Sequence, residues 1–417
     1  MVFYRCLVEK RLIKRCFQGI TTFTGKVRSS LDYKIAKIAW KKLSMQTKVV
    51  GNQVMFFTYQ DKYTDNQKYL CEELIASGFD GKIVWVYSDK TGNELSQFPK
   101  EVTLVKFGTF DYYKAMASSK FWIDNAHNCT WEGFPKKDEQ IYINTWHGSM
   151  GLKKINAEVD TNRNRRRAGK RANKITNYCI SNSKFEEMVF NTTYWPDVEY
   201  LRYGHCRNDI LFATDDIKSK LKAKVCRQFG IDTNKKILLY APTFRDGNNL
   251  EYLDIDYKRL KEALEEKFGG EWVIFSRFHF HVLLKHRDKV VNLRSGMDYV
   301  FVADDYNDMQ ELLAISDIGI TDYSSWICDY VLTGKPGFLY TTDIESYVTE
   351  RGFYYPLEDT PFPICKNNDE LIHNIKVFDQ NEYNEKTIKY LKGLGCAEDG
   401  NASKRLVELI NQKKENK

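Results

Sequence analysis

Short apolar runs alternate along the chain with segments in which apolar residues recur every three or four positions. The runs are rich in β-branched and aromatic residues, as buried strands are, and the segments between them have the spacing of amphipathic helices. This alternation predicts parallel sheets whose strands are joined by crossover helices. The runs form two series, at 54–59, 82–87, 102–107, 120–125, 140–146, 177–182 and 199–204, and at 236–242, 271–278, 298–304, 317–325 and 336–341.

The two series meet near 205–220, which predicts an α/β protein of two Rossmann-like domains facing a cleft. We expect an N-terminal domain over 49–212, a C-terminal domain over 213–390, and a helix with a charged tail over 391–417. A chain of 417 residues agrees with two domains, because a single core rarely grows beyond about 250–300 residues. Ligands of open α/β sheets bind beyond the carboxyl ends of the strands, so residues that follow strands are the candidates for function.

The first 48 residues differ from the rest in charge. They hold 12 Lys and Arg against 2 Asp and Glu, a net charge of +10, whereas the whole chain carries +7. Apolar residues at helical spacing within 2–20 and 31–46 predict two basic amphipathic helices. Two interpretations stay open, a surface for an anionic membrane and a helical pair packed on the body. No nucleic acid partner is expected, because nucleic-acid enzymes more often carry positive charge across the body.

Several classes of protein are excluded by missing patterns. No run approaches the roughly 20 apolar residues of a membrane span. Ten scattered cysteines without a CxxC pair argue against disulfide scaffolds and zinc ribbons and favour a reducing cytosol. The absence of GxxxxGK[ST], of GxGxxG after a strand and of GxSxG argues against P-loop NTPases, dinucleotide oxidoreductases and α/β-hydrolases. No metal or cofactor is expected.

His147 is the first candidate for chemistry. It follows the run 140–146 directly and precedes Gly148, which permits close approach of the backbone, so its position suits a general base. A satisfied core histidine is the alternative. Beyond it lies a basic run without an acid, interpreted either as a solvated helix face or, together with Gly148 and Ser149, as contacts for an anionic acceptor or for lipid headgroups. The run comprises Arg163, Arg165, Arg166, Arg167, Lys170, Arg171 and Lys174.

Further candidates follow strands of the second series. Thr243 and Arg245 come after the run 236–242, and Arg is a natural partner of phosphate oxygens, with a salt bridge as the alternative. Arg277 and His279 end the run 271–278, where His281 is a competing candidate.

The segment Thr321-Asp322-Tyr323-Ser324-Ser325 follows the apolar part of the run 317–325 and opens a helix that carries Asp329. Hydroxyl and free N–H groups at a helix N-terminus form a phosphate site that requires no metal. Helix capping by Asp322 or Ser324 is the alternative, and the two functions are compatible.

Seven blocks of the chain, taken together, resemble the CDP-glycerol glycerophosphotransferases, which include teichoic acid primases and polymerases and related capsule polymerases. The resemblance covers roughly residues 110–370. It implies a GT-B fold and peripheral attachment to the cytoplasmic face of the cell membrane. It also implies transfer of glycerol phosphate from CDP-glycerol to a lipid-linked acceptor. The blocks are INTWHGSMGLKKI (143–155), YGHCRNDIL (203–211), ILLYAPTFRD (237–246), RFHF (277–280), ELLAISDIGITDYSSWICDY (311–330), GKPGFLY (334–340) and ERGFYY (350–355).

The resemblance also implies roles for individual residues. His147 matches the base of the N-terminal domain, and His279 matches the histidine that assists at the donor pyrophosphate. Arg245, Ser324, Ser325 and Asp329 match donor-contacting positions. Two blocks depart from the family pattern, toward the acceptor side or the domain hinge. Ser149-Met150-Gly151-Leu152 replaces Thr-Pro-Leu, and Gly204-His205-Cys206-Arg207-Asn208-Asp209 replaces Gly-Tyr-Pro-Arg-Asn-Asp.

The expected reaction is attack of an acceptor hydroxyl on the β-phosphorus of the donor. His147 takes the proton and CMP leaves, in a transfer that depends on positioning and charge neutralisation. Two other enzyme functions stay open: transfer from CDP-ribitol or another CDP-alditol, and a nucleotide-sugar glycosyltransferase on the same fold. The non-enzyme alternative is a membrane or RNA-binding protein that uses the two basic clusters.

Overall fold

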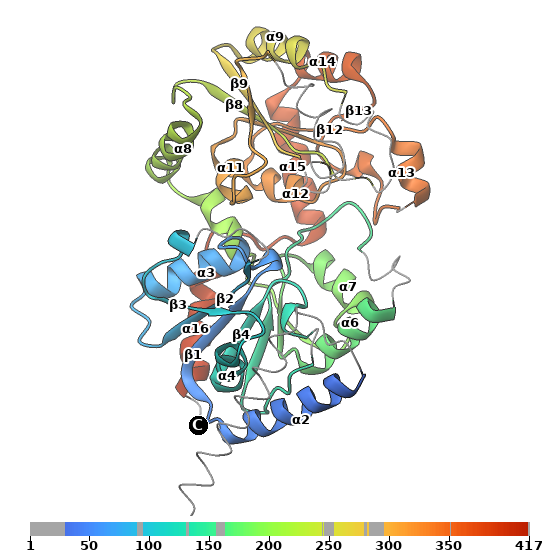
Figure 1. The fold of residues 1–417 in the computed structure, drawn as a ribbon. Coiled ribbons are helices and arrows are strands. Elements are labelled where there is room, and N and C mark those ends of the chain that lie inside the picture. The colour runs from blue at the N-terminus through green and yellow to red at the C-terminus, as the bar shows by residue number, and fades with distance from the viewer. Residues whose placement is uncertain are drawn as a thin grey trace, which may run out of the picture.

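The structure is a computed structural model that describes residues 30–89, 95–130, 133–155, 163–243, 245, 254–278, 282, 296–350 and 352–415. The helix expected at 2–20 and the candidates His279 and His281 lie outside these residues. Within them the chain forms two α/β halves, which Figure 1 shows one above the other. The halves contain the earlier and the later series of predicted strands, so the predicted class of two Rossmann-like domains is confirmed.

The first half contains a seven-stranded parallel sheet in the order β3-β2-β1-β4-β5-β6-β7. Its strands are β1 (Val50–Phe57), β2 (Lys82–Tyr87), β3 (Val102–Lys106), β4 (Ser119–Asp124), β5 (Ile141–Asn144), β6 (Tyr178–Ile180) and β7 (Glu199–Leu201). Its helices are α2 (Ser30–Gln46), α3 (Asp65–Ala76), α4 (Phe110–Ser118), α6 (Arg163–Ile175) and α7 (Lys184–Thr193).

Both faces of this sheet are covered, and the central strands are apolar and buried over 54–57 in β1 and 121–123 in β4. Along β1, Met55 and Phe57 pack with α2 and α4 on one face, and Val54 and Phe56 pack with α3 on the other. This is the two-residue alternation of a strand between two helical layers. The last helix, α16 (Ala402–Glu415), returns from the second half and joins the layer of α3, as the red helix beside β1 in Figure 1 shows.

The second half contains a six-stranded parallel sheet in the order β10-β9-β8-β11-β12-β13. Its strands are β8 (Lys236–Tyr240), β9 (Trp272–Ser276), β10 (Val300–Val302), β11 (Ile318–Thr321), β12 (Gly337–Tyr340) and β13 (Ile364–Cys365). Its helices are α8 (Asp215–Phe229), α9 (Tyr257–Phe268), α11 (Met309–Ile315), α12 (Trp326–Tyr330), α13 (Ile344–Glu350), α14 (Asn368–Lys376) and α15 (Gln380–Leu394).

The strand order places a switch point in each sheet. The order reverses between β1 and β4 in the first sheet and between β8 and β11 in the second. Chain segments leave these neighbouring strands in opposite directions across the sheet, and the gap between them is where doubly wound folds bind ligands. The segments that follow these strands therefore define the expected site.

Polar contacts hold the two halves together. Lys68 of α3 forms ion pairs with Asp308 at 2.5 Å and with Glu311 of α11 at 2.7 Å, and all three side chains are buried. The segment after β5 pairs with the other half through an antiparallel bridge between Lys153 and Phe353. No helix in the described part of the chain is long and apolar enough to cross a membrane.

A candidate active site between the two sheets

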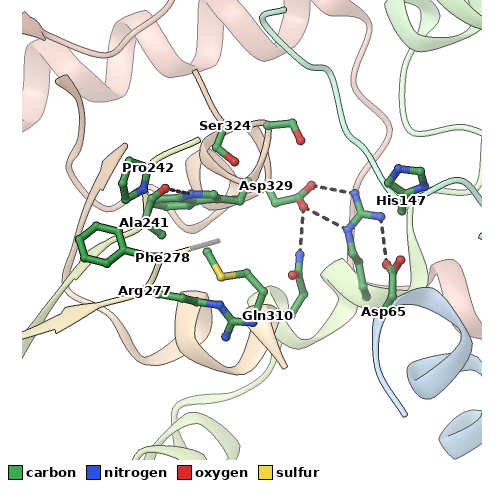
Figure 2. Close-up of a pocket in the computed structure, with 13 residues that line it drawn as sticks. Asp65, His147, Ala241, Pro242, Arg277, Phe278, Gln310, Ser324 and Asp329 are labelled. Atoms are coloured by element: carbon green, nitrogen blue, oxygen red, sulfur yellow. Dashed lines mark hydrogen bonds and ion pairs between the residues drawn. The ribbon is translucent and has the colours of Figure 1, made fainter. Parts of the chain in front are cut away.

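A cavity of about 270 Å³ lies between the halves, beyond the carboxyl ends of the strands at both switch points. In Figure 2, His147 and Asp65 approach it from the first half, and Ser324, Arg277 and Pro242 approach it from the second. Strand ends from both sheets thus contribute to one site, as the sequence predicted. The lining residues are Asp65, His147, Arg207, Ala241, Pro242, Arg277, Phe278, Met309, Gln310, Ser324, Ser325, Trp326 and Asp329.

The His147 imidazole is accessible from this cavity. Its Nδ1 lies 2.6 Å from the carbonyl oxygen of Asn125, which can only accept, so Nδ1 carries a proton and Nε2 keeps its lone pair in the neutral ring. His147 is exposed toward the cavity, yet desolvation by the protein around its ring lowers the pKa of the imidazole below its ordinary value. The hydrogen bond to Asn125 and the charge of Asp65 act in the opposite direction on the pKa. The neutral ring can accept a proton from a substrate.

The preceding residue, Trp146, determines how His147 is presented. Trp146 has φ of 54°, a left-handed conformation that a bulky residue rarely adopts. Its N–H donates to Oδ1 of Asn144 at 2.8 Å, and its indole packs edge-on against Trp195 and Phe190. These contacts hold the chain in a sharp turn after β5, and the turn directs His147 toward the cavity.

Arg207 crosses the boundary between the halves. It comes from the short helix over 206–212, and its Nε lies 3.1 Å from Asp329 while its Nη1 lies 3.3 Å from Asp65. Its Nη2 donates to the carbonyl of Gly148. The guanidinium is buried, and it holds the pKa of Asp329 below its ordinary value even though burial alone would raise that pKa. Arg207 therefore connects the His147 turn to α12.

Arg277 gives the second half a cation at the cavity. Its Nη1 donates to the carbonyl of Tyr306 at 2.6 Å, and it forms no ion pair with any residue that the structure describes. Burial lowers the pKa of Arg277 below its ordinary value. A half-buried guanidinium that has no carboxylate partner among the described residues favours binding of an anion. Ser324 and Ser325 line the same cavity and can donate hydroxyl groups to that anion.

Arg245 was expected to contact a phosphate, but it does not line this cavity. It is buried, with Nη1 2.8 Å from Asp322 and Nε 2.7 Å from Asp343, and it stacks on Tyr323 and Tyr347. The salt bridge offered as the alternative is therefore present. The role of Arg245 in donor contact stays a prediction.

Asp322 has a different role from the helix cap that the sequence allowed. Its Oδ1 accepts from the backbone N–H of Thr243 at 2.8 Å and thereby joins the segments that follow β8 and β11. α12 begins with Ser325 as its N-cap residue, whose side chain forms no capping hydrogen bond. Thr321 is buried and donates to the carbonyl of Ala241, so it too supports the segment that follows β8. The capping interpretation was wrong, because the Asp322 carboxylate is occupied by Arg245 and by backbone N–H groups.

The remaining candidates lie outside the cavity. Ser149 accepts a hydrogen bond from Asn182 at 3.1 Å, behind the His147 turn. The basic run forms α6, where Arg166, Arg167 and Lys170 are exposed and Arg171 is half-buried. The side chains of Arg163 and Arg165 lie outside the described residues. Among the described residues, no group of three or more His, Cys, Asp and Glu side chains could hold a metal ion.

Comparison with known proteins identifies the family. The model of the family described as CDP-Glycerol:Poly(glycerophosphate) glycerophosphotransferase matches residues 39–412. A teichoic acid poly(glycerol phosphate) polymerase of Bacillus spizizenii is 30% identical, over 86% of this chain and 91% of the relative. A polymerase of the same description from Staphylococcus epidermidis is 29% identical over 86% of this chain, which spans about half the length of that relative, 50%.

A solved structure supports the same assignment. The wall teichoic acid polymerase TagF superposes with a TM-score of 0.77 at 25% identity, covering 98% of each chain. This likeness confirms the expected arrangement of two facing Rossmann-like domains. Because the family model matches most of the chain, the protein belongs to the CDP-glycerol:poly(glycerophosphate) glycerophosphotransferases.

Proposed function

We propose that this protein transfers glycerol phosphate from CDP-glycerol to a hydroxyl group of a lipid-linked acceptor or growing polymer and releases CMP. The observation that carries the proposal is the hydrogen bond from Nδ1 of His147 to the Asn125 carbonyl, which leaves Nε2 as a base at the cavity. Arg277 and the hydroxyl groups of Ser324 and Ser325 line the same cavity. A base and an anion site that share one cavity support a phosphotransfer reaction.

In the proposed reaction the acceptor oxygen forms a bond to the β-phosphorus of the donor, and the bond from that phosphorus to the bridging oxygen breaks. The acceptor proton passes to Nε2 of His147, and the bridging oxygen leaves with CMP. Arg277, Ser324 and Ser325 interact with the charge that accumulates on the pyrophosphate. Arg245 acts at a distance by holding the segment after β8, and His279 stays a candidate for the same pyrophosphate.

Replacement of the base tests the proposal. His147→Ala should lower kcat by roughly 10²–10⁴-fold, the usual contribution of a general base, while CDP-glycerol still binds. The control is His373→Ala, because His373 is exposed on α14, away from the cavity. CMP release with a lipid-like acceptor measures turnover, and calorimetry measures donor binding. Turnover of His147→Ala within threefold of the wild type would contradict the assignment.

The identity of the donor needs a separate experiment. CDP-glycerol, CDP-ribitol and a nucleotide sugar should be offered in parallel, with CMP and nucleoside diphosphate resolved as products. We expect CMP from CDP-glycerol as the principal product. Preferred turnover of CDP-ribitol would show that CDP-ribitol is the donor, with the proposed mechanism unchanged. Release of nucleoside diphosphate would indicate a glycosyltransferase.

We also propose peripheral attachment to an anionic membrane through α2. One face of this helix packs on the body, as the second interpretation of the basic N-terminal segment requires, because Ala36, Trp40 and Leu43 are buried there. The opposite face exposes Ile38 at 70% and Met45 at 75%. Exposed apolar side chains among lysines are typical of helices that lie in a membrane interface. The basic face of α6 is the second candidate for contact with lipid headgroups.

Vesicle co-sedimentation tests this attachment. Ile38→Asp/Met45→Asp should weaken binding to phosphatidylglycerol-containing vesicles severalfold, because two apolar contacts are lost and negative charge is added. Val377→Asp is the matched control, since Val377 is 58% exposed at the end of α14. Salt should also weaken binding, because charges near the bilayer are screened within about 8–10 Å. Equal pelleting of both variants would show that membrane contact does not depend on α2.

A further inference from the structure

Asn125 connects His147 to a carboxylate that sequence patterns did not indicate. Asn125 follows β4 at the switch point of the first sheet and is buried. Its carbonyl accepts from His147, its Oδ1 accepts from the backbone N–H of Tyr59 at 2.9 Å, and its Nδ2 donates to Oδ2 of Asp65 at 2.6 Å. Tyr59 and Asp65 thus bond to the two polar atoms of the Asn125 side-chain amide, and the backbone carbonyl of Asn125 selects the tautomer of His147.

The second oxygen of Asp65 contacts Arg207, which in turn bonds to the residue after His147. Its Oδ1 lies 3.3 Å from Nη1 of Arg207, and Nη2 of the same guanidinium donates to the carbonyl of Gly148. One carboxylate therefore supports the residue that accepts from the imidazole and, through Arg207, the residue that follows it. Figure 2 shows Asp65 beside His147, with a dashed line from Asp65 to the guanidinium.

Backbone strain is concentrated around the same carboxylate. In the part of the chain that the structure describes, positive φ in residues other than glycine occurs at Asp61 (54°), Asp65 (61°) and Trp146 (54°). Such conformations cost about 1–3 kcal/mol each and persist where the surroundings enforce them, often at active sites. Asp61 lies between β1 and α3, Asp65 is the first residue of α3, and Trp146 precedes His147.

A role in helix capping does not explain Asp65. It is the first residue of α3, where an acid commonly interacts with the N-terminal N–H groups. The hydrogen-bond and ion-pair partners of its carboxylate among the described residues are instead Asn125 and Arg207. Its side chain is 15% exposed and lines the cavity. The strained backbone therefore directs this carboxylate away from its own helix and toward the site.

We propose that Asp65 is a positioning residue that, through Asn125 and Arg207, holds His147 as a base with Nε2 directed into the cavity. This proposal rests on the proposed function, in which His147 accepts the acceptor proton. It resembles the arrangement in which a third group orients the base that serves a nucleophile.

The sign of the electrostatic effect follows from the charges that face His147. These are Asp65 from α3, Asp124 at the end of β4, Arg207 from the short helix, and the neighbouring ring of His127. Burial lowers the pKa of His147, and the negative charge of Asp65 counteracts part of that effect. Removal of this charge should therefore lower the pKa of His147 further. The acid limb of the pH profile of kcat should then move to lower pH, because His147 with a lower pKa stays neutral at lower pH.

The test compares Asp65→Asn with Asp61→Asn. Asn adopts positive φ more readily than most residues, so both variants keep the left-handed backbone and lose one charge. We expect Asp65→Asn to lower kcat by about 10–100-fold, with the KM for CDP-glycerol unchanged. This range is the one found for residues that orient a histidine bound to a metal ion. Asp61→Asn should leave kcat within twofold. The imidazole pKa of His147 is measured by NMR and assigned by comparison with His147→Ala.

The NMR measurement separates two failures. If the wild type releases no CMP from CDP-glycerol, the proposed function fails, but a lowered pKa of His147 in Asp65→Asn still supports the positioning role. An unchanged imidazole pKa and an unchanged acid limb in Asp65→Asn would overturn the proposal, whatever happens to kcat. A raised KM for CDP-glycerol with normal kcat would also overturn it, because that result would place Asp65 in donor binding.

Discussion

Replacement of Arg207 by Met should destabilise the protein strongly. Arg207 and Asp329 are both buried, with their side chains 4% and 5% exposed, and the two residues lie 122 positions apart in the chain. Met matches the length of the aliphatic part of Arg but supplies no charge. The carboxylate of Asp329 would then stay buried with only the amide donors of Asn208 and Gln310. Leaving the charge of Asp329 buried without a cation raises the free energy of the folded state.

The expected magnitude follows from the burial of the pair. Removal of one partner of a buried ion pair costs about 3–5 kcal/mol. Because each kcal/mol lowers Tm by roughly 2–4 °C in a domain of this size, Arg207→Met should lower Tm by about 6–20 °C. The matched control is Arg202→Met. Arg202 forms two contacts with Glu187, at 2.8 and 2.5 Å, but its side chain is 35% exposed, and such pairs contribute about 1 kcal/mol or less.

Differential scanning fluorimetry of the full chain measures both variants, and a double variant identifies the cause. If the loss arises from the bare carboxylate of Asp329, then Arg207→Met/Asp329→Asn should be more stable than Arg207→Met alone. Equal losses for Arg207→Met and Arg202→Met would refute the reasoning. A double variant that is less stable than Arg207→Met would show that the energy lies in packing, not in charge compensation.

Three further predictions concern other buried groups. Burial raises the pKa of Glu398 to about 7 from an ordinary 4.5. The folded protein therefore keeps this proton where the unfolded chain has lost it, and Tm should fall as pH rises from about 5 to 7, a slope that Glu398→Gln should reduce. Arg245→Lys should raise the KM for CDP-glycerol and lower Tm, because Lys cannot pair with Asp322 and Asp343 at once; an unchanged KM would argue against a link to the donor. Ile410→Ala should cost about 2–5 kcal/mol in urea unfolding, since Ile410 of α16 is fully buried in the first half; a loss below 1 kcal/mol would contradict that packing.

The central strands of both sheets could be predicted because each buries an apolar run between two helical layers. β2 has the predicted bounds, and β8 and β9 begin and end within the predicted runs. β13 was missed because two residues carry no periodicity. The partner of α16 could not be predicted either. An apolar stripe shows that a helix packs on something, but it does not show that this helix crosses from the second half to the first.

The candidate site was predictable in location and only partly in composition. The rule that ligands bind beyond the carboxyl ends of strands pointed to His147, Arg277 and Ser324, because it requires only the positions at which strands end. It could not assign partners. Arg245 also follows a strand, yet two aspartates that come 77 and 98 residues later in the chain occupy its guanidinium. Asp65 was missed because its partners, Asn125 and Arg207, are far from it in sequence.

The fold explains why these distant residues meet. Tyr59 and Asn125 follow β1 and β4, the strands between which the first sheet reverses its order, and Ala241 and Asp322 follow the equivalent pair, β8 and β11. Each sheet therefore presents two diverging segments at one point, and the facing of the halves brings the two points together. The described residues that line the gap come from both halves. Arg207 is bonded to the turn of His147 on one side and to Asp329 on the other, so it links the residue that we propose as the base to the half that we propose to bind the donor.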